Sequence, residues 1–146
     1  MEFNKVLIPV VGSEADIEAL KLAIRLAKKE KGKIWSVYVI TIKRALPLNA
    51  EIKPEIEKAE NILDHLEIMA EEEEYEVETD VLQAREVGPA IIDEAVEREV
   101  DLILMGVKYK RRFGQFSLGS VVPYVLKNSP CPVIPVSYTH LTLPTN

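Results

Sequence analysis

The segment between Gly106 and Ser120 carries the side chains of this chain best suited to bind an anion. Four of its residues are basic and lie within five positions: Lys108, Lys110, Arg111 and Arg112. Such side chains form charge-assisted hydrogen bonds with phosphate oxygens. Gly119 and Ser120 lie where a helix is expected to begin, and free N–H groups at a helix N-terminus attract phosphate. The pattern favours a phosphate site.

The same segment has two simpler interpretations. A solvated basic loop keeps an exposed part of the chain in water, and its charges can also pair with acidic residues of a protein partner. Ser120 is a favoured helix cap whether or not a ligand binds. These alternatives stay open at the level of sequence.

A second glycine-containing turn, Val11-Gly12-Ser13, follows the first apolar run. Ser13 precedes Asp16 by three positions, which is a relaxed form of the capping box. We expect Ser13 to cap a helix and not to act as a nucleophile, because no G-x-S-x-G motif surrounds it. No pair of a nucleophile and a base is found elsewhere, so we expect no catalytic residue and no enzyme.

The elements that position these turns alternate between short apolar runs and helical patterns. Strands are expected at residues 5–11, 33–40, 75–81, 101–107 and 133–136. Helices are expected from residue 15 until Gly32 ends the first of them, and at 54–74, 88–96 and 118–128. Strict alternation predicts parallel strands with right-handed crossovers and helices on both faces. We therefore predict an α/β, Rossmann-like open parallel five-stranded sheet of order 3-2-1-4-5. Ligands bind such sheets at the carboxyl ends of the strands where the order reverses, here between strands one and four.

Three segments carry a resemblance to a known family. VLIPVVGSE at 6–14, DLILMG at 101–106 and GSVVPYVLKNSPCPVIPV at 119–136 are similar to the universal stress protein family, and the resemblance extends over residues 5–136. Nucleotide-binding members have a glycine, two residues, a second glycine, nine residues, and then glycine with serine or threonine. Gly106, Gly119 and Ser120 match this pattern, whereas Tyr109 replaces the middle glycine. Val11 replaces an aspartate that those members usually carry.

The resemblance implies an adenine nucleotide, ATP or AMP, with Val39 beside the base. The expected binding residues are Pro9, Val11, Gly12, Ser13, Val39, Met105, Gly106, Lys108, Arg111, Gly119, Ser120 and Val121. The function would be that of a stress-response or regulatory module. The alternative, motivated by Val11 and Tyr109, is a dimeric interaction or regulatory domain without a nucleotide, including one that acts on a membrane transporter. The resemblance is also compatible with slow ATP hydrolysis, but no residue of this chain can be nominated to catalyse that reaction.

The composition narrows the class of partners. With 18 basic and 24 acidic residues the net charge is −6, which argues against general nucleic-acid binding. The chain has no signal peptide, no apolar run of about 18 residues and a single cysteine, Cys131, so we expect a cytoplasmic protein without membrane insertion. The widely spaced His65, Cys131 and His140 do not form a zinc motif. The resemblance implies a homodimer through the strand Val133–Val136.

The end of the chain differs from the rest. Residues 137–146 contain no charged side chain and no helical period, and with Val136 they resemble the translation of a sequencing adapter. We therefore expect one domain over residues 1–136, and a non-native or disordered tail over 137–146.

Overall fold

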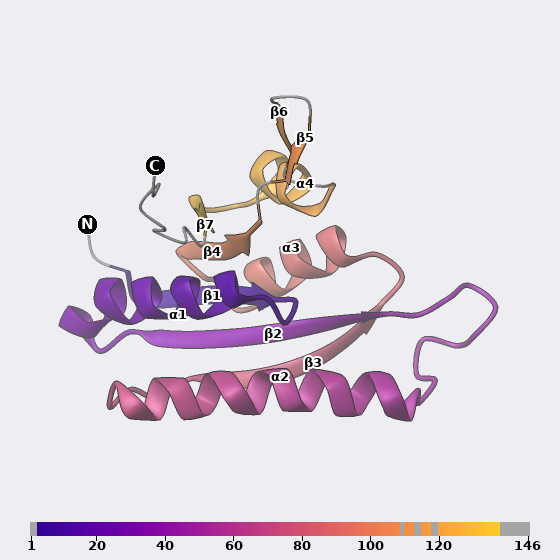
Figure 1. Cartoon of the computed structure of the whole chain (residues 1–146), viewed down its shortest axis with the longest axis horizontal. Helices are drawn as coiled ribbons and strands as arrows, with labels where there is room; N and C mark the ends of the chain where they lie inside the picture. The colour runs from indigo at the N-terminus through magenta and orange to yellow at the C-terminus, as the bar shows by residue number, and fades with distance from the viewer. Residues whose placement is uncertain (1–2, 109, 113–114, 118–119, 138–146) are drawn as a thin grey trace, which may run out of the picture.

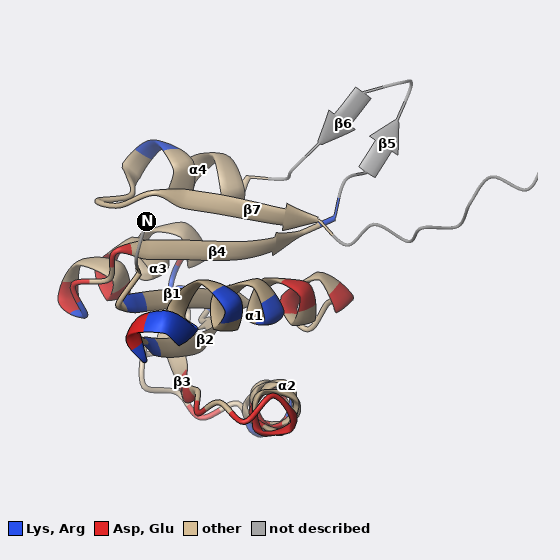
Figure 2. Ribbon diagram, turned by 90° about the vertical axis from the view of Figure 1, so that its left-hand side faces the viewer, with Lys and Arg blue, Asp and Glu red and all other residues tan. Residues whose placement is uncertain are grey.

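Five parallel strands form the central sheet in the computed structural model, which describes residues 3–108, 110–112, 115–117 and 120–137. The strands are β1 (Lys5–Val10), β2 (Lys33–Thr41), β3 (Glu78–Ala84), β4 (Leu102–Val107) and β7 (Val133–Ser137). Their order is β3-β2-β1-β4-β7, which Figure 2 shows as a stack from β7 at the top to β3 at the bottom. The predicted order 3-2-1-4-5 is confirmed, with β7 as the predicted fifth strand.

Helices cover both faces of this sheet, as predicted (Figure 1). The helices are α1 (Glu14–Ala27), a short 3-10 turn (Lys28–Glu30), α2 (Lys53–Glu72), α3 (Val87–Glu97) and α4 (Val121–Asn128). The helices α1 and α2 pack with β1 around one buried cluster, and α3 and α4 pack around another. Among the described residues, no helix is long and apolar enough to cross a membrane.

The burial of each strand follows from its place in the sheet. Residues Val6 to Val10 of β1 are all buried, because this central strand is covered on both faces. At the edge, Glu78 and Asp80 of β3 are exposed. The predicted third strand began at Tyr75, three residues too early. Residues 75–77 do not pair with β2, and the Tyr75 hydroxyl donates a hydrogen bond to the carbonyl of Gly32 instead.

The segment after β4 contains a hairpin that the sequence analysis treated as a loop. Strands β5 (Lys110–Arg112) and β6 (Gln115–Ser117) pair in antiparallel fashion. Three-residue strands carry too few positions to show a period of two, so they could not be predicted from hydrophobic periodicity. The following helix, α4, begins at Val121, three residues after its predicted start.

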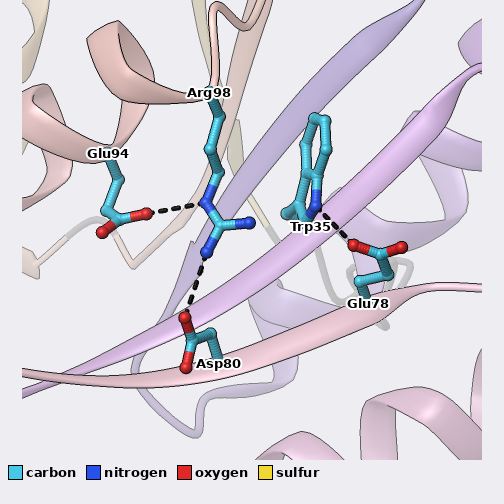
Figure 3. Close-up of polar contacts among 5 residues, drawn as sticks. All are labelled: Trp35, Glu78, Asp80, Glu94 and Arg98. Atoms are coloured by element: carbon cyan, nitrogen blue, oxygen red, sulfur yellow. Dashed lines mark hydrogen bonds and ion pairs between the residues drawn. The ribbon is translucent and has the colours of Figure 1, made fainter.

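A polar cluster joins the C-terminal end of α3 to the amino ends of β2 and β3 (Figure 3). Arg98 lies with its guanidinium carbon 5.5 Å from the centre of the Trp35 ring, and its nitrogens bond Glu94 Oε2 at 2.7 Å and Asp80 Oδ2 at 3.0 Å. The Trp35 indole N–H donates to Glu78 Oε2 at 2.7 Å. These contacts hold the C-terminal end of α3 at the amino ends of the strands. The predicted ligand site lies at the opposite, carboxyl ends.

We predict that Gly106→Ala destabilises the fold. An added Cβ would lie 2.5 Å from the backbone carbonyl carbon and oxygen of Ala15, so β4 or the first turn of α1 must shift. Overpacking of this kind lowers the free energy of unfolding by about 2 kcal/mol. Urea denaturation measures it, with the exposed neighbour Lys108→Ala as a control expected to change stability by less than about 0.5 kcal/mol. Equal stability of the two variants would contradict this close approach.

Candidate functional site

A cavity of about 370 Å³ lies at the carboxyl ends of β1 and β4, where the strand order reverses. β1 pairs with β2 on one side and with β4 on the other, and this brings turns distant in sequence to one edge of the sheet. The predicted site residues that line the cavity are Pro9, Val11, Val39, Met105, Gly106, Lys108 and Val121. The structure thus gathers the residues predicted from β1, β2, β4 and the start of α4 around one space.

The walls of this switch-point cavity also include residues that the sequence analysis missed. Val87 and Ile91 come from the first turns of α3, and Tyr38 and Thr41 come from the end of β2. The helical period marked Ile91 as a core residue, but not as a ligand contact. Only the packing of α3 over β2 places it beside the cavity, and this packing cannot be read from local sequence.

The chemistry of the switch-point cavity combines an apolar wall with a cation. Val39, Val87, Ile91 and Met105 offer aliphatic and thioether surface, against which a flat heterocycle can pack. The exposed Lys108 supplies a positive charge suited to an anionic group. The position where nucleotide-binding relatives of the resembled family carry aspartate is filled by Val11, whose side chain is 63% exposed. The aliphatic side chain of this valine cannot accept a hydrogen bond from a sugar hydroxyl.

The turn after β1 has already satisfied its backbone N–H groups. The Asp16 carboxylate accepts hydrogen bonds from the N–H groups of Val11 at 3.2 Å, Gly12 at 2.7 Å and Ser13 at 3.0 Å. The predicted capping interaction between Asp16 and Ser13 is therefore present, and it extends over the whole turn. An intramolecular carboxylate thus occupies the donors that would otherwise face a phosphate.

Burial raises the pKa of the Asp16 carboxyl above its ordinary value, while the N–H groups of Gly12, Val11 and Ser13 act in the opposite direction. The side chain is only 2% exposed, so the loss of hydration is the larger effect.

Gly12 adopts a φ of 91°, a left-handed conformation that glycine tolerates without strain.

The remaining predicted site residues lie elsewhere. Gly12 and Ser13 line a different cavity, between α1 and α2. Ser120 is exposed and lies immediately before α4 as its cap residue; it does not line the switch-point cavity, although its neighbour Val121 does. Arg111 lies in β5, after the end of β4. Gly119 and the family departure at Tyr109 fall outside the described residues.

Two further groups considered from the sequence can be placed. Burial raises the pKa of the half-buried Cys131 thiol, so little nucleophilic thiolate forms at neutral pH. His65 is exposed on α2. Within the described part of the chain, no group of three or more His, Cys, Asp or Glu side chains is arranged to hold a metal ion.

The fold and the place of the cavity define a doubly wound α/β domain with a switch-point site, and sequence comparison identifies its family. The family model described as "Universal stress protein family" matches residues 2–137. The universal stress protein MJ0531 of Methanocaldococcus jannaschii is 32% identical over 140 residues, covering 92% of this chain and 82% of that protein. The chain belongs to the universal stress protein family, as the resemblance implied.

Solved structures of the same fold agree with this assignment. The structure of the protein MJ0577 has a TM-score of 0.77 and 25% identity, covering 96% of this chain and 99% of that one. A universal stress protein of Archaeoglobus fulgidus, solved in complex with dAMP, has a TM-score of 0.74 and 20% identity, covering 93% and 99% of the two chains. A family protein of Arabidopsis thaliana with AMP bound has a TM-score of 0.66 and 15% identity, covering 98% and 97%.

The raised pKa of Asp16 predicts a particular pH dependence of stability. A carboxyl whose pKa is higher in the folded than in the unfolded state contributes fully below the unfolded pKa, and the contribution is lost as pH rises through the folded pKa. The ordinary value for this group is 3.8. We therefore expect the stability of the wild type relative to Asp16→Asn to be greatest near pH 3 and to fall as pH rises above 4.

Urea denaturation of both proteins from pH 3 to pH 7 measures this difference. Because all other titrating groups are shared, their contributions cancel. Ile68→Ala, at an exposed position on α2, removes no titrating group and is the control, whose stability difference from the wild type should not change with pH. A stability difference that grows in favour of the wild type with rising pH would contradict the prediction.

Proposed function

We propose that this chain binds an adenine nucleotide, ATP or AMP, in the switch-point cavity and acts in a stress response or in regulation. The observation that carries the proposal is the cavity of about 370 Å³ where the predicted residues of β1, β2 and β4 converge. Its volume falls in the range typical of small-molecule sites. The nucleotides in the structures of the two related proteins, dAMP and AMP, support the choice of ligand. The proposal includes no catalytic step.

The adenine base would pack against the apolar wall formed by Val39, Val87, Ile91 and Met105. The phosphate groups would extend toward Lys108 and the basic segment that follows it. They cannot use the turn after β1, because Asp16 holds its N–H groups. We therefore expect the segment after β4 to bind the phosphates. Its basic residues are the side chains best suited to an anion in this sequence.

The two departures from the family pattern affect affinity differently. A left-handed backbone at a residue other than glycine costs about 1–2 kcal/mol, whereas a hydrogen bond from a lysine to phosphate contributes about 1.5–3 kcal/mol. The basic residues can therefore offset a cost at Tyr109. Val11 has no such compensation, since no acidic side chain is among the described residues that line the cavity. We expect affinity to come from the base and the phosphates, with little contribution from the sugar.

Val39→Trp should fill the space for the base and weaken nucleotide binding at least tenfold. Isothermal titration calorimetry with ATP, ADP and AMP measures the dissociation constants, which we expect to lie below about a millimolar in the wild type. Val96→Trp is the matched control, because Val96 is 58% exposed on α3 and does not line the cavity. Its affinity should equal that of the wild type.

Two results would contradict the proposal. The first is the absence of saturable binding of all three nucleotides to the wild type. The second is wild-type affinity in a folded Val39→Trp variant, which would place the nucleotide elsewhere.

The alternative function, a dimeric interaction or regulatory domain that works without a nucleotide, has one observation in its favour. Within the described residues β7 is an edge strand that pairs only with β4, and Ile134 on it is 36% exposed. An unpaired strand edge is a template for pairing with a second chain. We propose a homodimer through Val133–Val136, with regulation of a protein partner such as a membrane transporter as the corresponding role.

Ile134→Asp should convert the dimer to a monomer, because a charge buried in an apolar interface is costly. Light scattering coupled to size exclusion measures the mass, and Val96→Asp on α3 is the control that should stay dimeric. A monomeric wild type, with or without residues 138–146, would remove the dimer from the account.

A further inference from the structure

A second cavity, of about 360 Å³, lies between α1 and α2. These helices cover the face of the sheet opposite to α3 and α4, whose residues line the switch-point cavity. We propose that this interhelical cavity binds a small uncharged molecule with an apolar body and one hydrogen-bonding group.

The walls are apolar and come from both helices. Ile17 projects from α1, and Ile62 and Leu66 come from α2. Leu66 is only 2% exposed, and the two isoleucines are half-buried. A cavity with such walls gives water few hydrogen-bond partners, and cavities of this kind bind benzene-sized molecules. Its volume is at the small end of the range for ligand sites, which favours a compact ring system.

The end of the cavity is shaped by a glycine. A Cβ at Gly12 would lie 2.8 Å from Ile62 Cδ1, so only glycine lets the isoleucine approach the turn this closely. The left-handed φ of 91° at Gly12 gives a second reason for this residue. The turn after β1 therefore forms a fixed wall, held by its hydrogen bonds to Asp16, which lines the same cavity.

The polar groups at the mouth select an uncharged ligand. Asn61 and His65 lie one helical turn apart on α2, and both are exposed. They offer an amide and an imidazole, which can donate to or accept from one hydroxyl, carbonyl or ring N–H. None of the lining residues is Lys or Arg, and Glu14 at the mouth repels an anion. A cation would meet the exposed Glu14 carboxylate, and exposed ion pairs contribute little. The Asp16 carboxyl also lines the cavity, but it already accepts hydrogen bonds from the N–H groups of Gly12 and Ser13.

The surroundings favour a small molecule over a protein segment. Among the described residues, none of the three apolar wall residues is an exposed large hydrophobic side chain. The apolar surface is thus recessed, whereas a docked helix lays its apolar face into an open hydrophobic groove.

The interhelical cavity and the switch-point cavity lie on either side of one turn. Val11 lines the switch-point cavity, whereas Gly12 and Ser13 line the interhelical cavity. The two cavities share no lining residue, so their ligands should bind without competition. The present proposal therefore succeeds or fails independently of nucleotide binding.

The test is a titration of the ¹⁵N-labelled full chain with indole, an uncharged bicyclic molecule with one N–H donor. We expect saturable chemical-shift changes at the amides of Gly12, Ser13, Asn61 and His65, with a dissociation constant below about a millimolar. The same changes should occur in the presence of excess AMP. Absence of saturable changes, changes at other sites only, or displacement by AMP would overturn the proposal.

Ile62→Trp should fill the cavity and weaken indole binding at least tenfold. Ile68→Trp is the matched control, because Ile68 lies on the same helix, is 54% exposed and does not line the cavity. Its indole affinity should equal that of the wild type. If circular dichroism shows that Ile62→Trp is unfolded, Ile17→Trp fills the cavity from the α1 side. Wild-type affinity in a folded filling variant would overturn the proposal.

Discussion

The hydrogen bonds between the Asp16 carboxylate and the turn after β1 hold that turn in one position at the carboxyl end of the central strand. One buried side chain satisfies the N–H groups of Val11, Gly12 and Ser13, and so ties the end of the central strand to the first turn of α1. Buried backbone N–H groups need a partner, and here the partner is internal. The turn is consequently a rigid wall between two cavities and not itself an anion site.

The close packing of β4 against α1 completes this arrangement. Gly106 lies so near the backbone of Ala15 that any side chain would collide with it, and the same glycine lines the switch-point cavity. The glycine of the family pattern therefore has a structural role here that does not require a ligand. Its presence alone is weak support for nucleotide binding, whereas the convergence of apolar walls with Lys108 is stronger.

The sequence predicted the architecture well, because the signals for it are local and repeated. Continuous apolar runs such as Val6–Val10 mark strands covered on both faces, and their alternation with helical patterns leaves few possible topologies. That topology placed the turns after β1 and β4 together, whereas Val39 on β2 was expected from the family resemblance. The sequence could not show that Asp16 bonds the whole turn, that α3 supplies Val87 and Ile91 to the cavity, or that α1 and α2 leave a space beside Gly12. Each of these depends on packing between segments distant in the chain.

The central claim is that a nucleotide occupies the space beyond β1 and β4 while the Asp16 bonds stay intact. A crystal structure of the chain with AMP tests it most directly. The account predicts the base between Val39 and Met105, the phosphate on the side of Lys108, and the carboxylate of Asp16 still bonded to the N–H groups of Gly12 and Ser13. A phosphate bound to those two N–H groups, with the Asp16 side chain displaced, would contradict it.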